Sequence, residues 1–299
     1  MAYTTTQLIN KIKLWGNVPT NQPAFTSTQL LDLATDELWT KTVPFINDLR
    51  EEYFVTYSDT SITTATDQSF DIPSRAAGGL LREVKLVNDD GDETDIPRIN
   101  PEYQQRHYFG FYIRGNKVFL IKSEDYSGYS LRLYYFVRPS ELVATSRCAQ
   151  VSSVSTSTFD VTSIPSNMTS GDTVDIVQAN PPFGTLSLGI TATWSSTTVT
   201  PSTMPSGLAV GDWMCLDQES CIPQVPLESH VLIVRGVVVR IMEILQDDKG
   251  LKSNLERLEQ EKETVANILT PRVIGEIKKI NNYESFLLNQ RDRSIYWFR

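Results

Sequence analysis

The segment from Pro226 to Leu269 carries the strongest periodic pattern in the sequence. Apolar residues recur in it at steps of three and four, which places them on one face of an α-helix. The first series consists of Val231, Val234, Val238, Ile241 and Leu245. Further apolar residues occupy much of the remaining circumference, so we expect other elements to cover this first helix. The series is too short and too charged to span a membrane.

The run Asp247-Asp248-Lys249-Gly250 interrupts this series. Glycine readily adopts the left-handed backbone conformation that ends many helices, so we expect Gly250 to cap the first helix. A second series, separated by Glu and Lys residues, consists of Leu251, Leu255, Leu258, Val265 and Leu269. The pattern therefore predicts two helices joined near Gly250, a buried helix followed by an amphipathic one with a charged outer face.

Length and composition narrow the class of protein. A chain of 299 residues can bury a substantial core and has room for two compact units. Its net charge of −9 argues against a free nucleic-acid-binding protein, which normally carries a basic surface. The first residues lack the basic and apolar layout of a signal peptide, so we expect a soluble protein made in the cytosol.

The regions before Ala144 differ in period. Residues 1–55 have helical spacing, with a cap signal at Thr26-Ser27-Thr28 and a restart at Pro44. Residues 56–144 alternate with a period of two and contain turn sequences such as Asn88-Asp89-Asp90-Gly91, so we expect an antiparallel β meander.

Residues 145–225 are rich in Ser and Thr and contain an internal repeat. Ser155, Pro165-Ser166 and Gly171-Asp172 recur at a constant offset as Ser195, Pro205-Ser206 and Gly211-Asp212. Each copy also contains an apolar strand, which a disordered linker would lack. Two copies of one strand unit predict a small β-sandwich or barrel with a pseudo-twofold axis.

Together these patterns predict an α+β protein. A helical bundle is formed by the N- and C-terminal segments, and an antiparallel β meander and a β-sandwich or barrel-like domain are inserted between them. The predicted parts are N-terminal helices at 1–55, the meander at 56–144, the Ser/Thr-rich β domain at 145–225, the long helices at 226–270 and a C-terminal docking arm at 271–299.

The last residues of the sequence combine basic and aromatic side chains. Chain ends are usually polar, so an apolar cluster there needs a surface to dock on, either the chain's own core or another subunit. Because aromatic side chains dominate binding energies, we expect the arm to dock on a partner. The predicted docking residues are Arg291, Arg293, Ile295, Tyr296, Trp297, Phe298 and Arg299.

Catalytic and metal-binding motifs are missing from the sequence. It contains no phosphate-binding glycine loop, dinucleotide fingerprint or nucleophile elbow. The histidines, His107 and His230, have no ligand partner at helical spacing, so we expect surface or capped residues. The cysteines, Cys148, Cys215 and Cys221, are odd in number and lack metal-ligand spacing, so we expect free thiols in a reducing compartment.

Two further segments admit a structural interpretation. The acidic run 88–93 departs from the spacing of a calcium-binding loop, and a hairpin turn accounts for it. Arg75 with Gly78-Gly79 indicates a close backbone approach, because no helix follows to make a phosphate site. We therefore expect no enzymatic activity, no metal and no cofactor. The weakest alternative is a hydrolase that uses a pair of carboxylates, because no motif in the sequence marks such a pair.

Three segments carry a family pattern: Leu30–Tyr53, then Asp71–Val84 with Leu133–Pro139, and Ile222–His230. Together they resemble the head-to-tail adaptor (neck or connector) proteins of tailed double-stranded DNA bacteriophages. The resemblance covers about half of the chain and leaves out the Ser/Thr-rich repeat.

The resemblance implies a structural virion protein, made in the host cytoplasm and located in the neck or tail. Such proteins form an oligomeric ring, commonly a dodecamer, that joins the portal protein to tail or nozzle proteins. The ring lines the channel through which double-stranded DNA passes without sequence-specific contact, and acidic walls would let the duplex slide. A C-terminal arm extends toward the portal.

A ring also needs contacts between neighbouring subunits, and the charged helix after Gly250 suits them. The predicted subunit-contact residues are Leu251, Leu255, Leu258 and Val265. The alternative function is a tail-associated binding module that recognises a glycan or a fibre through the β-repeat domain.

Overall fold

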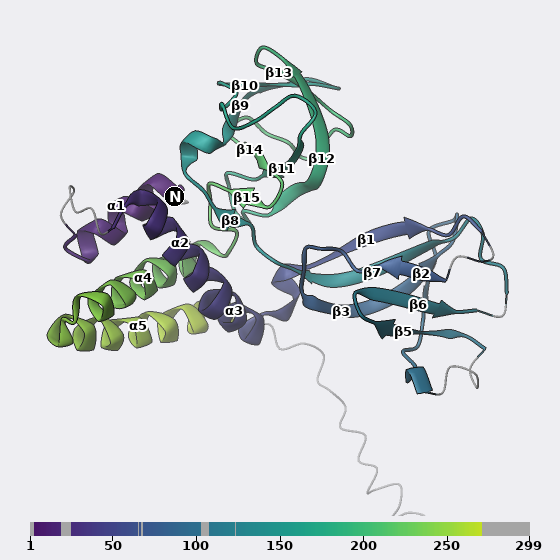
Figure 1. The fold of residues 1–299 in the computed structure, drawn as a ribbon, viewed down its shortest axis with the longest axis horizontal. Coiled ribbons are helices and arrows are strands. Elements are labelled where there is room, and N and C mark those ends of the chain that lie inside the picture. The colour runs from purple at the N-terminus through teal and green to yellow at the C-terminus, as the bar shows by residue number, and fades with distance from the viewer. Residues whose placement is uncertain are drawn as a thin grey trace, which may run out of the picture. The chain divides into compact units, whose positions relative to one another are not determined.

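The computed structural model of this chain describes residues 3–18, 25–64, 66, 68–102, 108–122 and 124–270 (Figure 1). Helices and antiparallel sheets occur together, which confirms the α+β class. Residues 1–269 form one compact unit, and nearly all of the second unit, 270–299, lies outside the described residues. No helix in the described ranges is both long and apolar enough to cross a membrane.

The N-terminal helices begin at reciprocal caps. In helix α1 (Thr5–Trp15) the Thr4 side chain accepts a hydrogen bond from the backbone N–H of Gln7, and the Gln7 side chain accepts one from the backbone of Thr4. Thr26 and Gln29 make the same arrangement at α2 (Ser27–Glu37). Such boxes satisfy amide groups that have no partner inside the helix. A π-helical turn (Leu38–Thr42) leads from α2 into α3 (Val43–Leu49).

The long C-terminal helices are α4 (His230–Leu245) and α5 (Asp248–Leu269). They join at Gln246, whose backbone is left-handed (φ 55°). The prediction that Gly250 caps the first helix is therefore wrong, since Gly250 lies inside α5. Asp247 explains the early restart, because its Oδ1 accepts a hydrogen bond from the backbone N–H of Gly250 (3.0 Å) and so caps α5.

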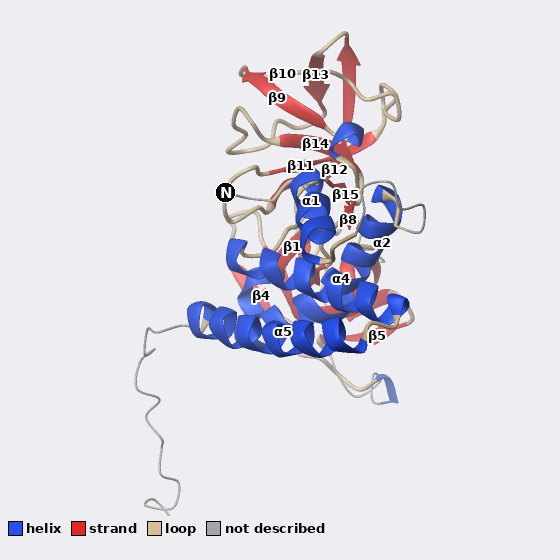
Figure 2. Ribbon diagram, turned by 90° about the vertical axis from the view of Figure 1, so that its left-hand side faces the viewer, coloured by secondary structure: helices blue, strands red, loops and turns tan. Residues whose placement is uncertain are grey.

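Helix α4 lies between α5 and the N-terminal helices (Figure 2). Most of its residues are buried, and apolar residues of helices α1 to α5 share one core. Gly236 permits a close approach to α2, because a Cβ atom there would lie 2.2 Å from the Glu37 carboxylate. The charge of Glu37 is balanced by Arg240, whose Nε donates to Glu37 Oε2 (3.0 Å).

The first β region forms two sheets. One has the strand order β1-β7-β3-β4 and the other β2-β6-β5. The bounds are β1 Val55–Ser61, β2 Ser69–Asp71, β3 Ala76–Val87, β4 Glu93–Asp95, β5 Gly110–Arg114, β6 Lys117–Ile121 and β7 Ser130–Val137. The strands pair antiparallel as predicted, but a simple meander is wrong, because β7 inserts between β1 and β3. Leu131, Leu133 and Tyr135 of β7 are buried in the core of these sheets, which suits a central strand.

The two glycines after Arg75 form an irregularity in β3. The register against β7 shifts between Ala76 and Leu81, and Gly78 and Gly79 have φ of +61° and +67°. A Cβ atom at either glycine would meet nothing nearer than 3.8 Å. The glycines are needed for their backbone conformation, so the prediction of a close backbone approach is wrong.

The Ser/Thr-rich region forms a closed barrel of six strands in the order β10-β13-β12-β11-β14-β9. Of the two predicted forms, sandwich and barrel, the barrel is the one present. The bounds are β9 Ala149–Val154, β10 Phe159–Val161, β11 Thr173–Val177, β12 Thr185–Ser195, β13 Thr198–Pro201 and β14 Trp213–Leu216.

Strand register reveals the symmetry of the repeat. Phe159 pairs with Val199 and Asp175 pairs with Cys215, and each pair joins equivalent positions of the two copies. A residue can face its own equivalent in an antiparallel pair only where a twofold axis passes between the strands. The pseudo-twofold axis predicted from the repeat therefore passes through β10–β13 and β11–β14. A short parallel pair, β8 (Glu141–Leu142) with β15 (Glu219–Ser220), lies outside the barrel.

Helix α4 provides a matched test of this core. Ile241 is fully buried, whereas Ile244 on the same helix is 59% exposed. Replacing Ile241 by Ala removes buried methyl groups and leaves a cavity, so we expect the free energy of unfolding to fall by about 2–5 kcal/mol. Ile244→Ala should change it by less than about 0.5 kcal/mol. Urea denaturation followed by circular dichroism measures both, and equal losses would show that the face of α4 is assigned wrongly.

Candidate functional site

The predicted partner-docking residues lie outside the described part of the chain. They are Arg291, Arg293, Ile295, Tyr296, Trp297, Phe298 and Arg299. His107 also falls outside it. Docking by this arm stays a prediction.

The four predicted subunit-contact residues divide into two kinds. Leu258 and Val265 are buried in the chain's own core, and Leu251 is half-buried against it. Leu255 is 42% exposed. Since a side chain that fills the subunit's core cannot also reach a neighbour, Leu255 and the exposed part of Leu251 are what a second subunit could cover. The contact with a neighbour itself stays a prediction.

Several more large apolar side chains of the helices are exposed. They are Leu14 of α1, Ile244 and Leu245 of α4, and Ile268 of α5. Around Leu255, the outer face of α5 carries the exposed charges Lys252, Glu256, Arg257, Glu259 and Glu263. The helices thus expose a mixed apolar and charged surface, a composition that suits contacts between subunits.

A second candidate site lies on the outer face of the barrel. Along β11, Val174 and Ile176 point into the barrel core, so Asp175 and Val177 point outward. Strand β15 covers this outer face, packing against β11 and β14 (Figure 1). We call the buried region between them the barrel junction. It contains an ion-pair cluster and three cysteines, and a buried histidine lies beside it against Phe183.

The ion-pair cluster is centred on Arg75. Its Nη2 group donates to carboxylate oxygens of Asp175 and Asp217, the latter at 2.8 Å, and Nη1 donates to Ser140 Oγ at 3.2 Å. Asp175 is fully buried, and its other hydrogen bonds come from the backbone N–H groups of Gly189 and Gln218. A buried carboxylate requires such pairing, because desolvation of an isolated charge is expensive. Sequence analysis gave Arg75 no such role.

His230 is buried at the start of α4 and both of its ring nitrogens are hydrogen-bonded, so of the two expected kinds, surface and capped, it is a capped residue. Nδ1 accepts from the backbone N–H of Tyr3 (3.4 Å), and Nε2 lies 3.2 Å from the carbonyl oxygen of Val225. These partners fit the neutral ring with its proton on Nε2. Burial lowers the pKa of His230 to about 4.

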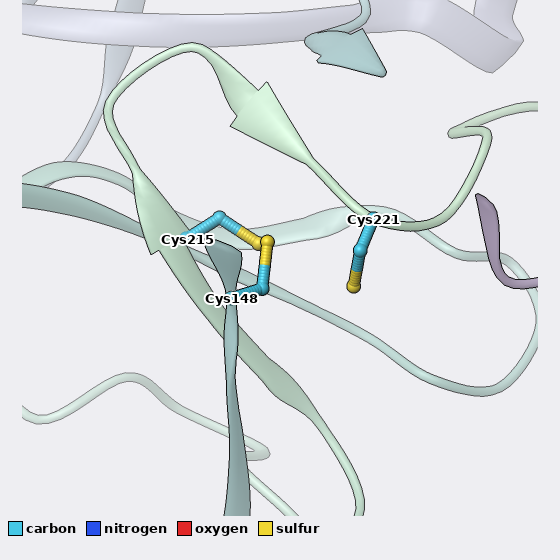
Figure 3. Close-up of side chains that lie close together, drawn as sticks. All are labelled: Cys148, Cys215 and Cys221. Atoms are coloured by element: carbon cyan, nitrogen blue, oxygen red, sulfur yellow. The ribbon is translucent and has the colours of Figure 1, made fainter. Parts of the chain in front are cut away.

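The three cysteines meet in the junction. The Sγ atoms of Cys148, Cys215 and Cys221 all lie within 4.8 Å of one another, and all three residues are buried (Figure 3). Each is a free thiol, as predicted. Their separation along the chain gave no sign of the cluster, because strand pairing brings them together. The β9–β14 register, continued by one residue, places Cys148 opposite Cys215.

Electrostatics distinguish the three thiols. Burial raises the pKa of Cys215 and of Cys221, whereas hydrogen bonds from these two thiols lower the pKa of Cys148. Next to the cluster, Arg147 forms an ion pair with Glu219 Oε1. The other carboxylate oxygen, Glu219 Oε2, is buried without a hydrogen-bond partner. The junction can therefore stabilise charge at Cys148, and it leaves one carboxylate oxygen available.

Comparison with known proteins gives a match to the first half of the chain. The family model described as SU10 adaptor protein matches residues 3–166, which is more than half of the chain. The match contains helices α1 to α3, both sheets of the first β region and the first two barrel strands. A search of curated proteins gave no match.

Buried neutral His230 predicts a specific loss of stability in acid. The imidazole has an ordinary pKa of 6.5 when unfolded and about 4 when folded, so the unfolded state binds the extra proton between these values. Stability is then complete above about pH 6.5 and falls as the pH drops toward 4, by roughly 3 kcal/mol in all.

The matching variant is His230→Gln, which keeps a polar side chain but does not titrate. We expect the difference in unfolding free energy between the wild type and this variant to shrink steadily from pH 7 to pH 4, as measured by urea denaturation. Carboxylates titrate in both proteins, so their contributions to the unfolding free energy cancel in this difference. A difference that does not change with pH would mean that His230 is not held neutral.

Proposed function

The chain belongs to the SU10 adaptor protein family, a phage adaptor family, and from this premise we propose that it forms an oligomeric ring joining the portal protein to the tail. The family makes the chain a structural component of the phage virion. In the proposed ring, helices from both ends of the chain act as one bundle, and the role is structural, without catalytic turnover. The observation that carries the proposal is the family match over residues 3–166.

The exposed surface of the helices supports assembly into a closed ring. A cyclic ring uses two different complementary surfaces on each subunit. Leu255 and Ile268 of α5 are 42% and 54% exposed, and Ile244 and Leu245 are exposed at the end of α4. Covering such side chains by a neighbour removes apolar area from water, which favours association. We propose a dodecamer, following the resemblance described above.

The charge of the chain supports a role as a DNA conduit. A channel wall that bound phosphates tightly would slow the passage of double-stranded DNA, and a net charge of −9 works against such binding. On α5, the exposed acidic residues Asp248, Glu256, Glu259 and Glu263 outnumber the exposed basic residues Lys249, Lys252 and Arg257 by one. We propose that DNA passes through the ring without sequence-specific contact.

The aromatic C-terminal residues supply the contact with the portal in this proposal. Tyr296, Trp297 and Phe298 together offer the apolar area of a binding hot spot, and Arg291 and Arg293 add charge for an acidic partner surface. The opposite side of the ring would receive tail or nozzle proteins.

Microscopy of the purified chain tests the proposed assembly. Negative-stain images of the chain, alone and mixed with the portal protein of the same phage, should show closed rings that attach to the portal. Deleting residues 291–299 should leave the melting temperature nearly unchanged and abolish attachment. A monomer or trimer that binds polysaccharide or a fibre would instead support the alternative, a tail-associated binding module acting through the barrel.

Leu255 allows a sharper test of the subunit contact. Leu255→Glu places a charge where we expect a neighbour to pack, so ring formation should weaken by at least about tenfold in concentration, because burying an unpaired charge is costly. Val210→Glu is the matched control, since Val210 is 64% exposed and lies in the barrel region. Sedimentation velocity over a concentration series measures both. Equal assembly of the two variants would exclude Leu255 from the contact.

A further inference from the structure

The cysteine cluster has nearly the dimensions of a metal site. The sulfur atoms of Cys148, Cys215 and Cys221 all lie within 4.8 Å of one another. In a tetrahedral zinc site the Zn–S bonds are about 2.3 Å, which puts the sulfurs about 3.8 Å apart. A small contraction of the cluster would therefore suffice. In Figure 3 the side chains of Cys148 and Cys215 point toward each other, and that of Cys221 lies beside them.

Strand β14 holds Cys215, and the other two cysteines lie in bends that adjoin strands β9 and β15. Cys215 belongs to β14, and Cys148 directly precedes β9, the strand that pairs with β14. The chain then turns back from β14 into β15, which delivers Cys221. The carbonyl oxygen of Cys221 accepts a hydrogen bond from the backbone N–H of Thr5 (2.8 Å). Ligands presented by paired strands keep their geometry better than ligands on free loops.

Glu219 is the candidate for a fourth ligand; its carboxylate is not among the atoms that lie within 4.8 Å of one another, so it would have to turn toward the sulfurs. Glu219 belongs to the short strand β15 and precedes Cys221, in the bend that follows, by two residues. Its Oε2 atom is buried and has no hydrogen-bond partner, while Arg147 holds Oε1. Because Arg147 directly precedes Cys148, this ion pair places the Glu219 carboxylate near the cluster. If the thiols packed only as small apolar groups, the buried Oε2 atom of Glu219 would be left without any partner.

We propose that Cys148, Cys215 and Cys221 bind one zinc ion as thiolates, with the Glu219 carboxylate as the fourth ligand. The three thiol protons pass to solvent when the ion binds. Three sulfurs and one oxygen around a closed, buried site suit zinc better than magnesium or calcium, which prefer oxygen ligands. The ion would link β9 and β14 of the barrel to the segment that leads into α4. This inference does not depend on the proposed ring.

Metal analysis of the full chain, purified without a histidine tag under reducing conditions, tests the site. We expect one zinc ion per chain by mass spectrometry of the metal content. A chelator should remove it and lower the melting temperature by several degrees, and added zinc should restore that temperature. Cobalt(II) added to the stripped protein should give the thiolate charge-transfer bands and visible bands of a tetrahedral site.

Variants then identify the ligands. Cys221→Ser should abolish zinc binding and the response of the melting temperature to zinc. Glu219→Gln should weaken binding by at least about tenfold and alter the cobalt spectrum. Glu141→Gln is the matched control, because Glu141 pairs with Glu219 in the β8–β15 register but is exposed, and it should bind as the wild type does.

Two results would overturn the proposal. In the first, the wild-type chain contains no zinc, its melting temperature responds to neither zinc nor chelator, and three thiols react with a thiol reagent after denaturation. In the second, two of the cysteines are joined by a disulfide in freshly purified protein. Should Cys221→Ser fail to fold, removing and restoring zinc in the wild type still decides the question.

Discussion

The contact between Arg75 and Asp175 is the constraint on which the barrel junction depends. Arg75 precedes the first-region strand β3, Asp175 and Asp217 come from the barrel region, and Ser140 lies on the segment between these two β regions. A buried charge tolerates few arrangements, because each one must supply both a counter-charge and the remaining hydrogen bonds. Apolar packing at the junction is less selective. The ion pair therefore specifies which face of the barrel meets the rest of the chain.

The barrel symmetry gives this junction two kinds of chemistry. Asp175 and Cys215 occupy equivalent positions of the two repeat copies and face each other across β11 and β14. One copy provides the carboxylate that Arg75 binds, and the other provides a thiol of the cysteine cluster. The interior positions around them, such as Val174 and Met214, are apolar in both copies and fill the barrel core. The two copies thus share interior packing and differ at the outward position.

The sequence predicted those features that depend on local pattern. Helical spacing located α4 and α5, and the repeat predicted a sandwich or barrel with a pseudo-twofold axis, of which the barrel is present. The prediction of a helix boundary at Gly250 was wrong, because Gln246 adopts the left-handed conformation and Asp247 caps α5 three residues earlier. The cysteine cluster and the Arg75 contacts could not be predicted, since pairing between distant strands creates them. Leu258 and Leu255 look alike in the helical pattern, and only the packing of α5 shows which one is buried.

A double-mutant cycle on Arg75 and Asp175 tests most directly whether this ion pair fixes the junction. Arg75→Met leaves Asp175 buried without its counter-charge, so we expect the free energy of unfolding to fall by about 3–5 kcal/mol. Adding Asp175→Asn should recover much of that loss, because the neutral amide needs no counter-charge and its oxygen still accepts a backbone N–H. Arg82→Met, at a side chain that is 38% exposed, serves as the control and should cost about 1 kcal/mol or less. Losses that simply add in the double variant, or an Arg75→Met variant as stable as the control, would contradict the account.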